Sequence, residues 1–113
     1  MKNIVLVILI TFLGFSAFSQ ENLSKNAKYD VKVNGNCEMC KSRIEKAAYS
    51  VPGVKTANWH VDNETVYLII NENKTDVATI QKAIAKVGHD TEAVKATEEA
   101  YDALPECCLY VRE

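Results

Sequence analysis

The stretch that decides the fold is residues 33–47, which read "VNGNCEMCKSRIEKA". Residues 29–34, which lead into it, alternate apolar and polar side chains, as a half-buried strand does. Residues 34–36 are turn formers and end that strand. After them, the apolar residues recur at helical spacing. Cys37 and Cys40 therefore stand at the point where a strand gives way to a helix.

The remaining elements follow from the same two hydrophobic periods. A helix from Glu38 ends at residues 52–53, a Pro-Gly pair. The alternating runs 54–61 and 66–71 are separated by a short turn and predict a hairpin. A second helix, capped by Asp76 and ended by Gly88, precedes a fourth, short strand at 90–96. The side chains expected to face the core are Tyr29, Val31, Val33, Cys40, Ile44, Ala47, Ala48, Val51, Ala57, Trp59, Val61, Val66, Leu68, Ile70, Val77, Ile80, Ile84 and Val87.

This order of elements, β-α-β-β-α-β, predicts an α+β fold of the ferredoxin-like type. Two amphipathic helices would cover one face of a four-stranded antiparallel sheet. Residues 96–113 lie beyond that fold as a C-terminal tail. The tail is expected to hold a short helix ending before Pro105 and carries a vicinal cysteine pair, Cys107 and Cys108.

The N-terminal segment has the pattern of a secretory signal peptide. One lysine precedes an apolar run over residues 4–15, and small residues follow at Ala17 and Ser19. The alternative, a membrane anchor, would need ~20 apolar residues, and this run is shorter. We therefore expect a signal peptide at 1–19, cleavage after Ser19, a flexible lead at 20–27 and no stable membrane span. The mature protein would be exported, either periplasmic or secreted.

Charge excludes one class of partner. The formal net charge is −2, and the sequence has no clustered basic face of the kind that binds nucleic acid. Lys41, Arg43 and Lys46 predict only a small positive patch, which would either meet an acidic partner or simply be solvated. All four cysteines lie in the mature part, and export places thiols where they tend to oxidise.

The C-x-x-C pair has several readings on physical grounds. Two thiolates at a helix start can converge on one ion, and the helix dipole favours the thiolate form there. Soft sulfur selects Cu(I) and similar ions, whereas a structural Zn(II) site needs four ligands. A thiol–disulfide redox pair and a structural disulfide are the alternatives. The residues alone leave all three open.

The same residues resemble a known family. The "GNCEMC" turn, "VPGV" at 51–54, the hairpin and "VGHD" at 87–90 are similar to the heavy-metal-associated domain, over residues 28–95. That family includes copper chaperones, modules of copper-transporting P-type ATPases and exported mercury-binding proteins. Its usual signature is G-M-x-C-x-x-C. This chain departs from it, because Asn36 directly precedes Cys37 and one residue fewer separates Gly35 from Cys37.

The resemblance implies a carrier or buffer and not an enzyme. Cys37 and Cys40 would bind a soft ion, Cu(I) first, with Hg(II) or Zn(II) as alternatives. The ion would pass by thiolate ligand exchange to or from a metal-donor or metal-acceptor protein such as a membrane metal transporter. The competing function is that of a thiol–disulfide redox protein using the C-x-x-C pair together with the tail pair.

Three further residues are candidates for the site. His89 lies in the loop that the predicted topology places at the same end as Cys37, so it would be a third ligand, would tune the thiolates, or would be an ordinary exposed loop residue. His60 is expected to point outward on its strand. The predicted fourth strand runs away from this end, so the tail would have to recross the sheet to bring Cys107 and Cys108 back. Its length suffices, and the two thiols would then be extra ligands or disulfide partners.

Overall fold

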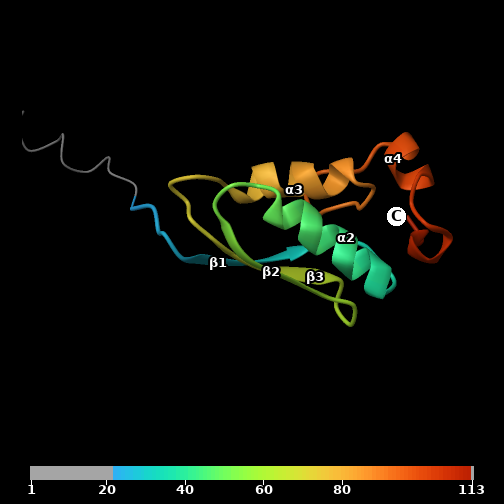
Figure 1. Cartoon of the computed structure of the whole chain (residues 1–113), viewed down its shortest axis with the longest axis horizontal. Coiled ribbons are helices and arrows are strands. Elements are labelled where there is room, and N and C mark those ends of the chain that lie inside the picture. The colour runs from blue at the N-terminus through green and yellow to red at the C-terminus, as the bar shows by residue number, and fades with distance from the viewer. Residues whose placement is uncertain (1–21, 113) are drawn as a thin grey trace, which may run out of the picture.

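The computed structural model describes residues 22–112 (Figure 1). Signal peptide and cleavage site, predicted at 1–19, therefore lie outside the described residues. Within 22–112, no helix is both long enough and apolar enough to cross a bilayer. The chain forms, in order, β1 (Ala27–Lys32), α2 (Glu38–Tyr49), β2 (Val54–His60), β3 (Thr65–Ile70), α3 (Val77–Lys86), α4 (Glu98–Asp102) and a short 3-10 turn, η1 (Glu106–Cys108).

The described strands form a three-stranded antiparallel sheet in the order β1-β3-β2. Helices α2 and α3 lie side by side on one face of the sheet. The tail, with α4 and η1, lies beyond the end of the molecule at which α2 begins and α3 ends (Figure 1). The predicted hairpin is confirmed, with Ala57 opposite Leu68 and Trp59 opposite Val66. The predicted cap of α3 is also confirmed, since Asp76 Oδ1 accepts a hydrogen bond from the Thr79 N–H at 2.8 Å.

The predicted core is right along α2 and along most of the sheet. The predicted apolar face of α2 is buried, as are Val66, Leu68 and Ile70 of β3. Two predictions were wrong. Tyr29 is 36% exposed, because its hydroxyl reaches outward to donate to Glu72 at 2.6 Å. Val61 is 47% exposed, because β2 has already ended and the hairpin turn has begun.

Hydrogen bonds join the segment before β1 to residue 72 from Ser24 onward. Strand β1 begins at Ala27, opposite Ile70, and not at Tyr29. Before it, the Ser24 N–H donates to the Glu72 carboxylate and the Ser24 carbonyl accepts from the Glu72 N–H. Strand β1 therefore starts two residues earlier than the sequence predicted, and the flexibility of the lead at 20–27 stays a prediction.

The fourth strand was also predicted wrongly. Segment 90–96 contributes only an isolated antiparallel bridge, in which Thr91 pairs with Val33 beside β1. The chain then turns, because the Thr91 hydroxyl donates to the Val94 carbonyl and accepts from the Val94 N–H. The Thr91 N–H also donates to the Val94 carbonyl at 2.8 Å. Local hydrogen bonds of a threonine side chain compete with a sheet ladder in this way.

This turn changes the path of the tail. The sequence predicted a strand that carries the chain away from the cysteine loop and a tail that recrosses the sheet. Instead, the chain reverses at 91–94, and α4 packs directly against the end of α3. A Cβ built on Gly88 would lie 2.7 Å from the Ala100 carbonyl oxygen and 2.9 Å from two atoms of Leu104. The tail therefore remains at the cysteine end throughout.

Gly88→Ala should lower the free energy of unfolding by about 1–2 kcal/mol or more. Gly88 has φ +108°, which a residue with a Cβ adopts with strain, and the added methyl would meet the backbone of α4. Urea unfolding followed by circular dichroism measures the change. Ser42→Ala, at an exposed position of α2, is the control and should stay within about 0.5 kcal/mol. A Gly88→Ala protein as stable as the wild type would contradict this packing.

Candidate metal centre

Local structure places Cys37 and Cys40 on the first turn of α2. Cys37 is the N-cap residue, with an extended backbone (φ −146°, ψ 175°), and its carbonyl accepts the Lys41 N–H. Cys40 points inward and is 0% exposed. The loop before α2 packs closely against Cys40 because residue 35 is a glycine. A Cβ on Gly35 would come within 3.0 Å of both the Cys40 Cβ and the Trp59 ring. The start of α2 thus brings both sulfurs to one point.

Four thiols meet at that point. Cys37 Sγ lies 3.4 Å from Cys40 Sγ, 3.5 Å from Cys108 Sγ and 3.5 Å from Cys107 Sγ. Cys107 and Cys108 are 3.9 Å apart. The sulfurs of Cys37, Cys40 and Cys108 all lie within 4.8 Å of one another, which makes them a possible ligand set for one ion. All four cysteines are free thiols in the structure.

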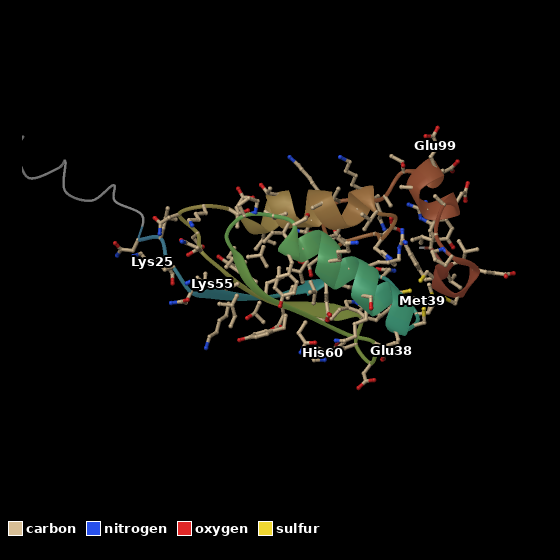
Figure 2. All side chains as sticks on the ribbon, viewed as in Figure 1. Lys25, Glu38, Met39, Lys55, His60 and Glu99 are labelled. Atoms are coloured by element: carbon tan, nitrogen blue, oxygen red, sulfur yellow. The ribbon has the colours of Figure 1, made fainter. Side chains whose placement is uncertain are left out.

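The four thiols differ in exposure. Cys40 and Cys108 are buried, Cys37 is half-buried, and Cys107 is exposed at the rim. Cys107 Sγ also lies 3.3 Å from Met39 Sδ, and Met39 is itself exposed. Figure 2 shows Met39 on the first turn of α2, beside the tail. The cluster therefore has a buried interior and a sulfur-rich mouth.

A network of hydrogen bonds, buried at Tyr110, holds the tail over the cysteine loop. The Tyr110 hydroxyl donates to the Gly88 carbonyl at 2.9 Å and accepts from the Asp90 N–H at 2.8 Å. The Asn36 side-chain amide donates to the Cys107 carbonyl at 2.9 Å. The Tyr101 hydroxyl donates to the Tyr110 carbonyl, and the two rings meet edge to face. These contacts fix η1, and with it the tail thiols, against the start of α2.

An ion pair completes this network. The Arg112 guanidinium donates to both carboxylate oxygens of Asp90, at 2.8 and 3.0 Å, and to the Ala96 carbonyl. Asp90 also accepts the Ala96 N–H at 2.8 Å. Burial raises the pKa of Asp90, but the hydrogen bonds from Arg112 and Ala96 outweigh it, so the pKa lies below its ordinary value. Arg112 further stacks over the Tyr101 ring.

The environment separates the pKa values of the thiols. Burial is the largest single influence on the pKa of Cys37 and raises it, but the Cys40 N–H and the three neighbouring thiols together outweigh burial and lower the pKa to about 7. The position of Cys37 at the start of a helix acts in the same direction. The pKa of Cys107 is raised, first by its hydrogen bond with Cys37 and then by burial. The pKa of Cys108 is raised strongly, first by burial and then by its contacts with Cys40 and Cys37.

His89 is not brought into the thiol cluster. It is 0% exposed, its Nδ1 donates to the Asn34 carbonyl at 2.9 Å, and its ring stacks on Tyr110. Burial lowers its pKa and keeps the imidazole neutral. Its Nε2 is buried without a hydrogen-bond partner in the described part of the chain. His89 therefore contacts the loop before Cys37 and packs against the tail. Of the roles expected from sequence, the exposed loop residue is wrong because His89 is buried.

The predicted positive patch is divided in the structure. Lys41 donates to Glu45, Asn58 and the Trp59 carbonyl on one side of α2. Arg43 donates to the Val87 carbonyl on the other side. Lys46 is exposed, and so is His60, as predicted for that strand. Two of the three cations are thus engaged within the molecule.

Sequence reasoning missed the residues that position the tail. Asn36 was noted only as a departure from a family signature, yet its side chain holds the Cys107 backbone. Tyr110 and Arg112 lie in a segment without periodicity, and their role depends on contacts with Gly88 and Asp90 that no local pattern reveals. Met39 lies between the two cysteines in sequence and contacts Cys107. Apart from its soft sulfur, nothing in the sequence pattern indicated this contact.

Fold and cluster together define the class of protein. The domain is a small βαββα unit with two cysteines at the start of its first helix. Their sulfurs converge with further thiols, which is the ligand type that soft metal ions prefer. The chain belongs to the heavy-metal-associated domain family, whose model matches residues 30–90, over half of the chain. The tail segment 96–113 lies beyond that match.

The relatives are copper proteins. A copper-exporting P-type ATPase of Bacillus subtilis is 35% identical over 75 residues, which are 66% of this chain and 9% of the ATPase. A copper chaperone CopZ of Staphylococcus epidermidis is 30% identical over 63 residues, 55% of this chain and 93% of the chaperone. The chain therefore spans only about a tenth of the length of the ATPases that it matches.

Solved structures share the ferredoxin-like fold. A CopZ metallochaperone has a TM-score of 0.56 at 29% identity, covering 57% of this chain and 98% of its own. An oxidised MerP from Ralstonia metallidurans CH34 has the same TM-score at 24% identity, covering 59% and 94%, a likeness of fold alone. None of these similarities supports the redox alternative.

Cys37 should be the first of the four thiols to react with iodoacetamide as pH rises. With a pKa of about 7 it is half ionised near neutral pH, whereas Cys107 and Cys108 stay protonated there. Mass mapping of the reduced, metal-free protein after short alkylation pulses between pH 5.5 and 9.5 gives the order. Preferential modification of the more exposed Cys107 at pH 7 would contradict this assignment.

Acid should weaken the tail network through Asp90. Because the folded-state pKa of Asp90 is depressed, its contribution to stability is fully present above the unfolded pKa of ~3.9 and is lost as pH falls through the lower folded value. Asp90→Asn should cost about 1–3 kcal/mol at pH 7 and flatten the loss of stability below pH ~4. Urea unfolding from pH 2.5 to 7 measures both effects.

The matched control for this prediction is Asp102→Asn. Asp102 is an exposed carboxylate at the end of α4, so its removal should leave the pH profile of the wild type in place. An Asp90→Asn protein with the stability and pH dependence of the wild type would show that the ion pair does not hold the tail.

Proposed function

We propose that the mature chain is an exported carrier or buffer of Cu(I), held by the thiolates of Cys37 and Cys40. The observation that carries the proposal is the convergence of these two sulfurs, 3.4 Å apart, on the first turn of α2. The helix start favours thiolate, and thiolate selects soft ions. The matched relatives, a CopZ chaperone and copper-exporting ATPases, support copper as that ion. Hg(II) and Zn(II) are the alternative ions for this site.

The transfer chemistry needs no catalytic side chain. A thiolate from a partner adds to an ion with few ligands, a shared intermediate forms, and one original sulfur leaves. The low coordination number of Cu(I) keeps this route open, whereas Zn(II) prefers a closed set of four ligands. We therefore propose a non-enzymatic carrier whose partner is a metal-donor or metal-acceptor protein such as a membrane copper transporter.

Export fits this proposal, but it would also expose the thiols to oxidation. A signal peptide at 1–19 would place the thiols in an oxidising compartment, where a Cys37–Cys40 disulfide would prevent loading. The sulfurs stand well beyond the length of a disulfide bond, about 2.05 Å. Mass spectrometry of the protein as isolated from its own compartment, with and without reductant, would determine whether the N-terminus begins at Gln20 and whether the thiols are free.

Cys37→Ser and Cys40→Ser should each strongly weaken 1:1 binding of Cu(I), because each removes one of the two thiolates that converge at the start of α2. Anaerobic titration of the reduced full chain against bicinchoninate gives affinity and stoichiometry. His60→Ala is the matched control, because it removes an exposed ligand-type side chain of β2 and should leave binding unchanged. Wild-type affinity in either serine variant would refute the assignment of the two ligands.

A further inference from the structure

We infer that Cys108 is a third ligand of the same ion, supplied by the tail, and that Cys107 is the outer thiol through which the ion is exchanged. This inference rests on the proposed function, since it concerns the ion held by Cys37 and Cys40. The family match ends at residue 90, so both tail thiols lie outside the part of the chain that resembles its relatives.

The spacing of the sulfurs fits one shared ion. With metal–sulfur bonds of ~2.3 Å, three sulfurs in a plane around an ion stand ~4.0 Å apart. The Cys37 sulfur lies 3.4 Å from Cys40 and 3.5 Å from Cys108, and all three sulfurs lie within 4.8 Å of one another. Movements of about half an ångström would complete a trigonal site.

The tail thiol is held in place before any ion arrives. Cys108 is 0% exposed and belongs to the hydrophobic core together with Leu104 and Tyr110. Its backbone N–H donates to the Pro105 carbonyl within η1. Tyr110, two residues on, is anchored to Gly88 and Asp90. A ligand fixed in this way loses little conformational entropy on binding, so it strengthens retention of the ion.

Cys107 occupies a different position, at the rim. It contacts Cys37 at 3.5 Å and Cys108 at 3.9 Å and is exposed, with the Met39 sulfur on its outer side. The sulfurs thus form two triangles that share the edge between Cys37 and Cys108. Cys40 completes the buried triangle, and Cys107 completes the outer one. An ion that enters the outer triangle reaches the buried one when Cys107 is replaced by Cys40.

The exchange balances without a redox partner. The Cys107 thiol releases its proton to solvent, and its thiolate donates an electron pair to Cu(I) as a bond from the ion to a donor thiolate breaks. The donor sulfur regains a proton from solvent. Cys37, Cys108 and then Cys40 add in the same manner, and Cys107 leaves and is reprotonated. Copper stays in the +1 state throughout.

The arrangement predicts a protein that retains its ion. In a site with two sulfurs, the third position is free for the thiolate of a partner. Here Cys108 occupies it, so a partner must either displace Cys108 or begin at Cys107. Loss of Cys108 should therefore weaken retention and open the site, whereas loss of Cys107 should slow exchange while the buried ligand set stays complete.

Cys108→Ala and Cys107→Ala, compared with the wild type, test both assignments. The reduced full chains are loaded anaerobically with one equivalent of Cu(I), and X-ray absorption at the copper edge counts the sulfur ligands. We expect three sulfurs in the wild type, two in Cys108→Ala and three in Cys107→Ala. Stopped-flow removal of Cu(I) by bicinchoninate should be about tenfold or more faster in Cys108→Ala and severalfold slower in Cys107→Ala.

Leu109→Ala, an exposed residue of the same tail, is the neutral control and should match the wild type. Amide spectra by NMR establish that each variant is folded. Should Cys108→Ala not fold, the wild-type and Cys107→Ala sulfur counts still decide. Two sulfurs in the wild type, or a loss of the third sulfur in Cys107→Ala, overturns the assignment of Cys108. Unchanged removal kinetics in Cys107→Ala overturns the assignment of Cys107.

These outcomes are distinct from failure of the proposed function. If the wild type binds no Cu(I), or binds it equally well in Cys37→Ser, then the carrier proposal fails before the tail is considered. If the wild type binds Cu(I) through two sulfurs, then the carrier proposal stands and the tail has no part in the ligand set. If peptide mapping of air-exposed protein shows Cys107 or Cys108 bonded to Cys37 and the reduced protein has two sulfurs per ion, the tail is a disulfide partner instead.

Discussion

The structure of the site depends on one buried carboxylate, that of Asp90. It accepts the Ala96 N–H and both arms of the Arg112 guanidinium, while its own N–H donates to the Tyr110 hydroxyl. These contacts join the end of the α3 loop to three points of the tail. A carboxylate buried without such partners would be strongly unfavourable, so the tail and the loop stabilise one another. Together with the Tyr110–Gly88 and Asn36–Cys107 hydrogen bonds, these contacts hold η1 over the start of α2.

Fixing the tail changes what the cysteine loop can do. The loop itself is set by the cap of α2 and by the close approach of Gly35 to Trp59, whose indole N–H donates to the Val33 carbonyl at 2.9 Å. By itself the loop would present the two sulfurs of Cys37 and Cys40 to solvent. With η1 in place, the sulfurs of Cys107 and Cys108 join them, and η1 covers part of the site. The proposed roles in retention and release of an ion then fall to different thiols, Cys108, which is buried, and Cys107, which is exposed.

Electrostatics couples this cluster to pH. Hydrogen bonds from the Cys40 N–H and the neighbouring thiols lower the pKa of Cys37, whereas the hydrogen bond with Cys37 raises the pKa of Cys107 and burial raises that of Cys108. Of these three thiols, Cys37 therefore ionises most readily in the metal-free state. Binding of a soft cation replaces those shared protons and releases them to solvent. The metal affinity of such a site increases with pH until every ligand is already deprotonated in the metal-free protein.

The sequence by itself determined the order of the first five elements, the position of Cys37 and Cys40 at a helix start, the cap at Asp76 and the stop at Gly88. These features are local, because hydrophobic period, capping residues and turn formers act over a few neighbouring positions. Only the tertiary structure decided that segment 90–96 turns back at Thr91, that His89 is buried beneath the loop and that Asn36 holds the tail. Those outcomes depend on contacts between residues distant in sequence, such as Asp90 with Arg112 and Cys37 with Cys108, which no local period encodes.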